Sequence, residues 1–246
     1  VYTNTSSAVN SMGLFGGVYG GGYVSNFVLV DVDIGGDETY QNMIVAPKYS
    51  MRTGAVSAHL ASTNSTVATI SQVGVFGSIN IKFCNYIGYV GGIVGFVNGN
   101  ILLEKSFNYA SVRSECQYGS TSSGYTGGIA GEVYGSSSST PIIDNCYNAG
   151  YVYGEGVYTG GLVGESYSGT YKANYRRCYN VGSVSGYYYK GGLFGCIYGS
   201  GGTVNNCFTD ANISSVYKFA RYSTYKSFAY KGSFAGYNNN GTITYC

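Results

Sequence analysis

Short apolar runs alternate with glycine along the chain, and one five-residue phrase returns many times. Its clearest copy is Gly-Gly-Leu-Val-Gly at 160–164. Cys-Tyr-Asn follows at 178–180, and Gly-x-Val-x-Gly follows at 182–186. Apolar runs separated by Gly and Ser predict three β-strands in each unit. In this copy the strands are expected at 161–165, 175–180 and 181–185.

The same unit recurs along most of the sequence. Its starts lie near 12, 53, 91, 127, 160, 191 and 232, which are 31 to 41 residues apart. In the second unit the phrase at 73–77 offers an alternative start. A repeat of this length is typical of solenoids, propellers or arrays. We therefore expect a single repeat domain over residues 1–246, and the non-Met start predicts that it is part of a longer chain.

Two architectures compete for a unit of this size. A propeller blade needs four strands in about 40–45 residues. The shortest spacing here, 31 residues, holds three strands more comfortably. Insertions at the corners of a solenoid leave its stack intact, which suits the variable spacing. The pattern favours an all-β fold, a right-handed parallel β-helix (β-solenoid) of about seven three-stranded coils.

Equivalent positions in a parallel stack lie about 4.8 Å apart and form ladders. The Leu of the first phrase predicts one inward ladder, and the Cys of the second phrase predicts another. The first ladder is expected to contain Leu14, Ala55, Ile93, Ile129, Leu162, Leu193 and Phe234. The second is expected to contain Cys84, Phe107, Cys146, Cys178, Cys207 and Cys246. The glycines are expected to let the chain bend between faces.

These phrases together resemble the GLUG repeat family. The resemblance extends from about residue 12 to the end, and it is strongest in the units that begin at 127, 160 and 191. Members of that family occur mainly in large secreted and cell-surface proteins, including adhesin-like proteins and some IgA-cleaving peptidases, where the repeats are accessory, non-catalytic modules. The resemblance therefore implies a β-solenoid and a surface location.

Composition narrows the functional classes. The 246 residues include 40 Gly and 29 Tyr, but only 10% are charged, against about 25% in an average soluble domain. A net charge of +2 without a Lys/Arg stripe argues against nucleic-acid binding. No apolar run is long enough to predict a membrane span. Low charge with many aromatic residues favours self-association.

The cysteines and the single histidine offer little site chemistry. Five of the seven Cys fall at one repeat position, which indicates a ladder of buried thiols rather than a disulfide framework. Cys116 and Cys196 lie off that register, and either could be free, paired or joined to another chain. Zinc is poorly supported, because there is no Cys-x₂-Cys and His59 has no partner at ligand spacing. We expect no metal and no cofactor.

The densest acidic cluster is Asp31 and Asp33 with Asp37 and Glu38. Asp31 and Asp33 are expected on one strand face, where they would suit Ca²⁺ or the paired carboxylates of a polysaccharide-cleaving β-helix. The simpler interpretation is a solvated strand edge, since no basic or His partner accompanies the cluster. Catalysis by a Cys/His pair would have to use His59 and is disfavoured.

Aromatic residues are the most informative surface feature. Tyrosine provides a large amphipathic contact area and is enriched at interfaces. The candidate binding or assembly residues are Tyr147, Tyr151, Tyr153, Tyr179, Tyr187, Tyr188, Tyr189 and Phe208. The alternative is that these rings only cover thin coils. Four Asn-x-Ser/Thr sequons, at Asn4, Asn64, Asn212 and Asn240, are candidates for glycosylation.

The leading hypothesis is a non-enzymatic structural or adhesive module, extracellular or on the cell surface, that associates with itself or with other surface proteins. Its motivation is the repeat, the low charge, the many tyrosines and the lack of a catalytic constellation. A glycan-binding module that uses Tyr ladders is the alternative. A polysaccharide-processing enzyme that uses Asp31, Asp33 or Asp37 is the third hypothesis.

Overall fold

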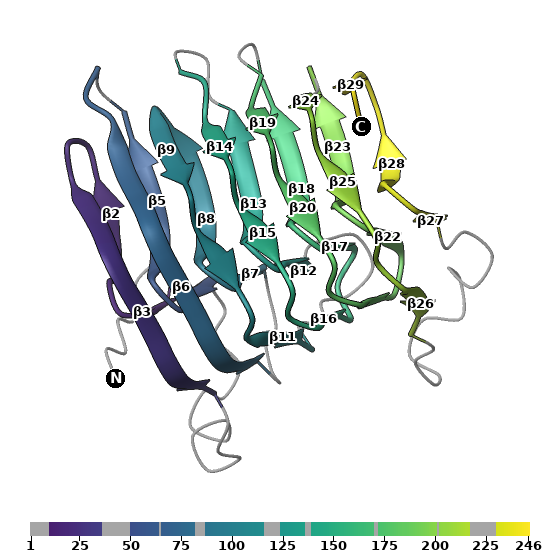
Figure 1. The fold of residues 1–246 in the computed structure, drawn as a ribbon, viewed down its shortest axis with the longest axis horizontal. Coiled ribbons are helices and arrows are strands. Elements are labelled where there is room, and N and C mark those ends of the chain that lie inside the picture. Colours follow the sequence, from purple (N-terminus) through teal and green to yellow (C-terminus); the bar gives the residue numbers. More distant parts are fainter. Residues whose placement is uncertain are drawn as a thin grey trace.

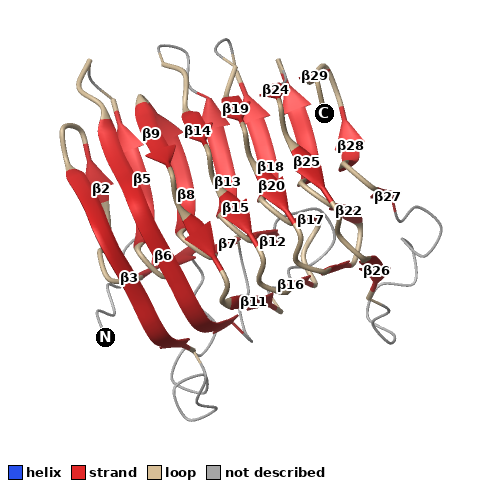
Figure 2. Ribbon diagram, viewed as in Figure 1, coloured by secondary structure: helices blue, strands red, loops and turns tan. Residues whose placement is uncertain are grey.

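The chain winds into a solenoid, seen side-on in Figure 1. The computed structural model describes residues 10–35, 50–63, 65–81, 87–115, 124–135, 139–169, 172–200, 202–216 and 230–246. These residues form strands, with no helix long and apolar enough to cross a membrane among them (Figure 2). Each strand pairs in parallel with its equivalent in the next coil. The predicted all-β parallel β-helix is therefore confirmed.

Three sheets form the walls of the solenoid. Sheet A contains β1 (Asn10–Met12), β4 (Met51–Gly54), β7 (Gly88–Gly91), β12 (Gly124–Gly127), β17 (Tyr158–Gly160), β22 (Tyr189–Gly191) and β27 (Tyr230–Gly232). Sheet B contains β2 (Val18–Tyr19), β5 (Ser57–Ser62), β8 (Val94–Gly99), β13 (Ala130–Gly135), β18 (Val163–Ser168), β23 (Phe194–Gly199) and β28 (Ala235–Asn238).

Sheet C is the largest sheet, with 15 strands. It begins with two long strands, and each later coil contributes short pieces to it. Its strands are β3 (Tyr23–Ile34), β6 (Ala68–Ile81), β9 (Ile101–Glu104), β10 (Phe107–Asn108), β11 (Ser111–Ser114), β14 (Ile142–Asp144), β15 (Tyr147–Asn148), β16 (Val152–Gly154), β19 (Asn174–Arg176), β20 (Tyr179–Asn180), β21 (Val184–Gly186), β24 (Thr203–Asn205), β25 (Phe208–Thr209), β26 (Ile213–Ser215) and β29 (Thr242–Thr244).

The repeated phrase spans a corner of the coil. Gly160 ends β17 and Val163 begins β18, so the strand expected at 161–165 starts two residues later and continues to Ser168. Leu162 lies at the corner and is buried in the core. The backbone leaves sheet A and enters sheet B within these two residues, and a Cβ on Gly160 or Gly161 would clash with a backbone carbonyl oxygen.

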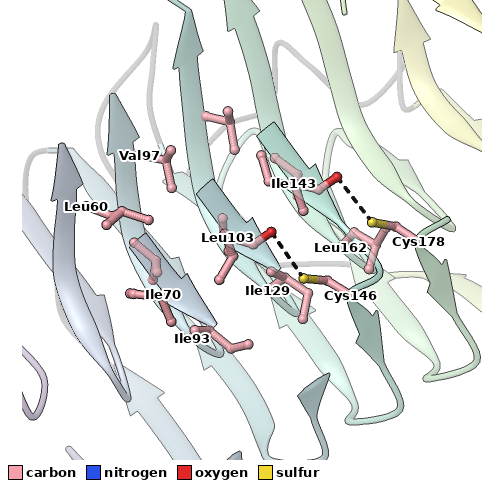
Figure 3. Close-up of a cluster of buried hydrophobic side chains, with 14 of the residues drawn as sticks. Leu60, Ile70, Ile93, Val97, Leu103, Ile129, Ile143, Cys146, Leu162 and Cys178 are labelled. Atoms are coloured by element: carbon pink, nitrogen blue, oxygen red, sulfur yellow. Dashed lines mark hydrogen bonds between the residues drawn. The ribbon is translucent and has the colours of Figure 1, made fainter. Parts of the chain in front are cut away.

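Strand register corrects the second repeat unit by one residue, because Gly54 pairs with Gly91 and the phrase there begins at Gly54. In the first unit Met12 pairs with Thr53 before the corner and Phe15 bridges Ser57 after it, so Leu14 lies opposite Val56. Val56 therefore replaces Ala55 in the inward ladder. The buried members are Val56, Ile93, Ile129, Leu162 and Leu193. Figure 3 shows Ile93, Ile129 and Leu162 of this ladder. Leu14, in the first coil, is 57% exposed, and Phe234, in the last, is half-buried.

A left-handed residue bends the chain at one position of every coil. It directly precedes an inward-pointing residue of sheet C. The seven residues are Asn26, Gln72, Lys105, Asn145, Arg177, Asn206 and Tyr245, with φ between 49° and 63°. Positive φ is unfavourable for most residues, and Asn tolerates it best. The Asn of the Asn-Cys phrase therefore suits this conformation, although Gln72, Lys105, Arg177 and Tyr245 adopt it too.

The thiol ladder forms, with different members from those expected. Phe107 pairs with Tyr147, so Ser106 and not Phe107 takes the position of Cys146. In the preceding coil that position holds Val73, and Cys84 lies outside the described residues, as does Cys116. The described cysteines Cys146, Cys178, Cys196, Cys207 and Cys246 are free thiols. Cys146 Sγ donates to the Leu103 carbonyl at 3.5 Å, and Cys178 Sγ to that of Ile143 at 3.6 Å (Figure 3).

A ladder of buried amides runs beside the thiols. Asn108 Nδ2 donates to Asn148 Oδ1 at 2.8 Å, and Asn148 Nδ2 donates to Asn180 Oδ1 at 2.8 Å. Each amide also bonds the backbone two residues further on, as Asn148 does with the N–H and carbonyl of Gly150. All three side chains are fully buried, so the ladder satisfies polar groups that would otherwise destabilise the core.

Candidate functional site

Stacked aromatic rings line the outer face of sheet C. Strands β10, β15, β20 and β25 place Phe107, Tyr147, Tyr179 and Phe208 in one register, here named the sheet C stack. Successive ring centroids lie 5.4, 4.7 and 4.9 Å apart, with interplanar angles of 16°, 2° and 6°. Three of the candidate binding residues therefore form one continuous feature.

Ring orientation decides what the sheet C stack can contact. Because the rings are nearly parallel, each inner ring has both faces covered by its neighbours, and its edge points outward. Tyr109 packs edge-on against Tyr147 at 5.9 Å, and Phe76 stacks on Tyr109 at 5.0 Å. Phe208 and Tyr109 are 52% and 46% exposed. The surface thus presents ring edges. Burial, together with the neighbouring Tyr109, raises the pKa of the Tyr147 hydroxyl to about 12.

A second stack follows sheet A. Its members are Tyr89, Tyr125, Tyr158, Tyr189 and Tyr230, here named the sheet A stack. Centroid distances run from 5.0 to 5.4 Å and interplanar angles from 5° to 18°. Only Tyr189 is among the sequence candidates. The signal that would have found the others is Tyr-x-Gly, which recurs at each corner phrase from Tyr89 onward.

The remaining predicted tyrosines do not join one surface. Tyr153 lies at β16, where the Arg113 guanidinium sits 4.1 Å from its ring centroid and its hydroxyl donates to Glu155 at 2.7 Å. Tyr151 packs near Tyr153 at 6.4 Å. Tyr188 packs edge-on against Tyr189 at 4.5 Å, beside the sheet A stack. The carbonyl of Tyr187 accepts a hydrogen bond from Lys190 Nζ at 3.2 Å.

The outer side chains of sheets A and B meet along a seam. On sheet B the row is His59, Phe96, Glu132, Glu165, Cys196 and Tyr237. Contacts across the seam join Tyr89 to Phe96 at 5.0 Å and Tyr189 to Tyr237 at 5.5 Å. This row was missed in the sequence. Its signal is a Glu five residues after the first Gly of the phrase in two successive units.

Glu132 and Glu165 are register partners in adjacent coils, here named the glutamate pair. They are 7% and 6% exposed. Burial raises the pKa of Glu132 to about 8, with a further rise from Glu165 and an opposing effect of Arg52. Burial raises the pKa of Glu165 to about 7. A pair of nearby carboxyls that both resist ionisation can share a proton.

The cationic end of the seam lies in the second coil. Arg52 Nη1 is 3.2 Å from His59 Nδ1, and its guanidinium lies 4.5 Å from the Phe96 ring centroid. The Tyr19 hydroxyl is 3.3 Å from the same His59 nitrogen. Burial and the charge of Arg52 lower the pKa of His59 to about 4, so the imidazole is neutral at physiological pH. It serves here as a packed ring beside Arg52.

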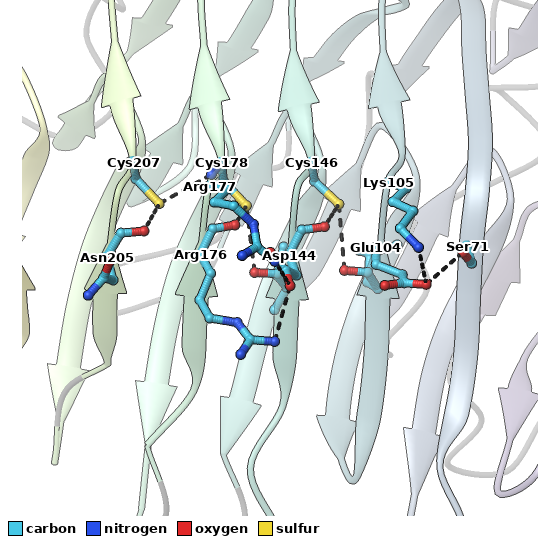
Figure 4. A network of polar contacts seen from close by, with 12 residues as sticks. Ser71, Glu104, Lys105, Asp144, Cys146, Arg176, Arg177, Cys178, Asn205 and Cys207 are labelled. Atoms are coloured by element: carbon cyan, nitrogen blue, oxygen red, sulfur yellow. Dashed lines mark hydrogen bonds and ion pairs between the residues drawn. The ribbon is translucent and has the colours of Figure 1, made fainter. Parts of the chain in front are cut away.

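An ion network ties coils together on sheet C (Figure 4). Asp144, 8% exposed, receives Arg176 at 3.1 Å and Arg177 at 2.5 Å. Glu104 accepts from Ser71 Oγ at 3.0 Å and pairs with Lys105 at 3.5 Å. The network links neighbouring coils, which is a stabilising role.

The predicted acidic cluster lies at the edge of the solenoid. Asp31 and Asp33 are exposed residues of β3, while Asp37 and Glu38 lie outside the described residues. The register of β3 shifts between Leu29 and Val32, and Asp31 has a φ of 54°, so the simple alternation expected for these carboxylates is interrupted. Among the described residues, no group of three His, Cys, Asp or Glu is placed to hold a metal.

Two of the four sequons can be placed. Asn212, before β26, and Asn240, between β28 and β29, are both exposed. Asn4 and Asn64 lie outside the described residues. Asn240 Nδ2 donates to the Gly199 carbonyl at 3.2 Å.

Comparisons with known proteins give a structural likeness and no family. No family model and no curated protein matches the chain. Among solved structures, the chain is similar to a crystal structure from Bacteroides ovatus named "putative immunoglobulin A1 protease". The two are 14% identical with a TM-score of 0.47, over 89% of this chain and 67% of that one. The GLUG resemblance therefore stays a prediction, and function has to be argued from the residues of this chain.

Proposed function

We propose that this chain is a non-enzymatic structural or adhesive module of an extracellular or cell-surface protein. In this role it contacts other proteins, including further copies of itself, through the outer face of sheet C. The observation that carries the proposal is the sheet C stack with its flanking rings, an aromatic strip that crosses several coils. Phe208, Tyr109 and Phe76 in or beside it are 52%, 46% and 37% exposed. Contiguous exposed apolar surface is typical of protein contact sites.

The glycan alternative is less favoured by the ring geometry. Sugars bind aromatic residues by stacking on an open ring face. Inside the sheet C stack, centroid distances of 4.7–5.4 Å leave no space for a ligand between rings. The same holds for the sheet A stack, whose closest rings are 5.0 Å apart. Protein side chains, in contrast, pack readily against ring edges.

The enzymatic alternative has one new candidate, the glutamate pair. Two carboxyls with raised pKa values are what general acid–base catalysis uses. More than nine-tenths of each side chain is buried, however, and tyrosines of both sheets flank it. A scissile bond could not come within hydrogen-bond reach of these oxygens without displacing those rings. A role inside the fold is the better explanation for the pair.

The proposal is tested by association and by activity. Sedimentation velocity and electron microscopy over a wide concentration range should show assembly. Phe208→Ser and Tyr109→Ser, which change exposed rings, should weaken it, whereas Tyr198→Ser, an exposed ring on sheet B, should not. Uniform monomers at every concentration, with no binding to proteins of the same cell surface, would contradict the contact role. Hydrolysis of a polysaccharide or protein that is lost in Glu132→Gln would contradict the non-enzymatic one.

A further inference from the structure

The glutamate pair is an unusual feature of a repeat fold. Most rows of this solenoid place identical or similar side chains above one another, and those side chains are compatible with their own copies. Here two glutamates are register partners on adjacent strands, whose backbones lie about 4.8 Å apart. Among the described residues, neither carboxyl has a cation within ion-pair distance.

The surroundings of the pair are aromatic on both sides. Tyr125 and Tyr158 of the sheet A stack lie along one side, and Tyr134 and Tyr167 of sheet B lie along the other, with their own rings stacked at 5.3 Å. Such walls leave the two glutamates only 7% and 6% exposed, and they offer no charge of their own to balance a carboxylate. Two ionised carboxylates here would repel each other in a medium of low dielectric constant.

We propose that the glutamate pair is a pH-responsive joint between the fourth and fifth coils, which is tight while the two carboxyls hold at least one proton and loosens when both ionise. While protonated, one carboxyl can donate a hydrogen bond to the other, which makes the two side chains complementary. Loss of the last proton removes that bond and leaves two like charges in the seam. The proposal concerns the fold itself and does not depend on the proposed function.

Other titratable groups face the pair. Arg52 is the charged group nearest on the cationic side, and it favours ionisation of Glu132. His59 lies beside Arg52 and is neutral near physiological pH. Tyr158 and Cys196 lie next to Glu165, and burial, with Glu165 contributing, raises the pKa of both well above neutral. Between pH 5 and pH 9 the pair is therefore the group in this part of the seam whose charge changes most.

The sign of the pH effect follows from the shifts. In the unfolded chain both carboxyls titrate near their ordinary pKa of 4.5, whereas in the folded chain they keep protons up to about 7 and 8. Stability from the pair is thus fully present below pH 4.5 and is lost as pH rises through the folded values. Between its unfolded and its folded pKa, each carboxyl is protonated in the folded chain and ionised in the unfolded chain. Over that interval it makes the unfolding equilibrium constant increase about tenfold per pH unit.

The test compares the pH dependence of unfolding in the whole chain. Urea unfolding of the parent and of Glu132→Gln/Glu165→Gln, from pH 5 to pH 9, should show a steep rise of the unfolding constant that is largely absent from the double variant. Glu104→Gln, at an outward glutamate paired with Lys105, is the matched control and should keep the parental slope. Equal slopes for parent and double variant would overturn the proposal.

A second measurement covers the case in which the double variant does not fold. Carbon-13 NMR of the parent, labelled at the glutamate carboxyl carbons, should show two resonances that titrate between about pH 6 and pH 9. Hydrogen exchange should accelerate above that range in β13 and β18 first. Glutamate resonances that all titrate near 4.5, or exchange that accelerates uniformly along the chain, would overturn the joint.

Discussion

Two buried polar rows of the solenoid behave in opposite ways. The amide ladder of Asn108, Asn148 and Asn180 is fully buried and fully bonded, because an amide has both a donor and an acceptor for its own copy. The glutamate pair is almost as buried, but an ionised carboxylate has only acceptors. In a parallel in-register stack each side chain meets its own equivalent. Self-complementarity, and not polarity as such, therefore decides what a row tolerates.

The largest effect is expected when a carboxylate is introduced into the amide ladder. Asn148→Asp keeps the shape but removes two donor hydrogens that reach Gly150 and Asn180. We expect a loss of about 3–5 kcal/mol in the free energy of unfolding at neutral pH, because a buried charge and two unpaired groups result. The loss should shrink at low pH, where the new carboxyl is protonated. Urea denaturation at both pH values measures it.

A surface substitution of the same kind is the control. Asn212→Asp changes an exposed amide before β26 and should alter stability by no more than about 0.5 kcal/mol. If Asn148→Asp were equally mild, the amide ladder would not be the support that its contacts indicate.

The reverse change, an amide in place of one carboxyl of the glutamate pair, should stabilise the fold at neutral and higher pH. Glu165→Gln replaces one carboxyl by an amide that can donate to Glu132, so the pair becomes complementary without a shared proton. At pH 8 we expect the free energy of unfolding to rise by about 2 kcal/mol. In the parent the fold raises the pKa of Glu165 and so disfavours the ionised carboxylate that the unfolded chain adopts at this pH, and the substitution removes that cost. At pH 4 the gain should vanish, because both states of the parent are protonated. Lower stability than the parent at pH 8 would contradict this.

In the aromatic rows each ring packs against the equivalent ring of the next coil by stacking. Tyr179 has ring neighbours on both sides, at 4.7 Å and 4.9 Å. Tyr179→Ala should lower the free energy of unfolding by about 1–2 kcal/mol, through lost stacking and lost burial. Tyr179→Phe should change it by less than about 0.5 kcal/mol, as the sheet C stack already contains Phe107 and Phe208. Equal effects of the two substitutions would show that the hydroxyl, and not the ring, matters.

The sequence predicted the coil because the phrase recurs, but it misjudged why glycine is there. None of the glycines at 160, 161 and 164 has a positive φ. A Cβ on Gly161 would meet the Gly192 carbonyl and the Asn180 amide, so the second glycine makes room for the amide ladder. In the second coil Val75 replaces the amide, and Ala55 replaces the glycine. Close approach of backbones cannot be read from a single repeat.

Register was the other limit of the sequence. The phrase in the second unit, Gly-Ala-Val-Ser-Ala at 54–58, lacks most of its glycines, and the alignment slipped by one residue. The sequence predicts Phe107 in the cysteine row, whereas Ser106 takes that position in the structure. Glu132 and Glu165 form no acidic cluster along the sequence, because they are 33 positions apart. Only three-dimensional pairing brings them together.

The thiol row provides the mildest test of self-complementarity. Cys178 Sγ donates to the Arg176 carbonyl at 3.2 Å, and its backbone N–H donates to Cys207 Sγ at 3.4 Å. The chain itself uses serine in this row, where Ser106 Oγ donates to the Glu104 carbonyl and accepts from the Val73 N–H. Cys178→Ser should therefore cost no more than about 1 kcal/mol. A larger loss, measured by urea denaturation under reducing conditions, would mean that the size of sulfur, and not its hydrogen bonding, fills this row.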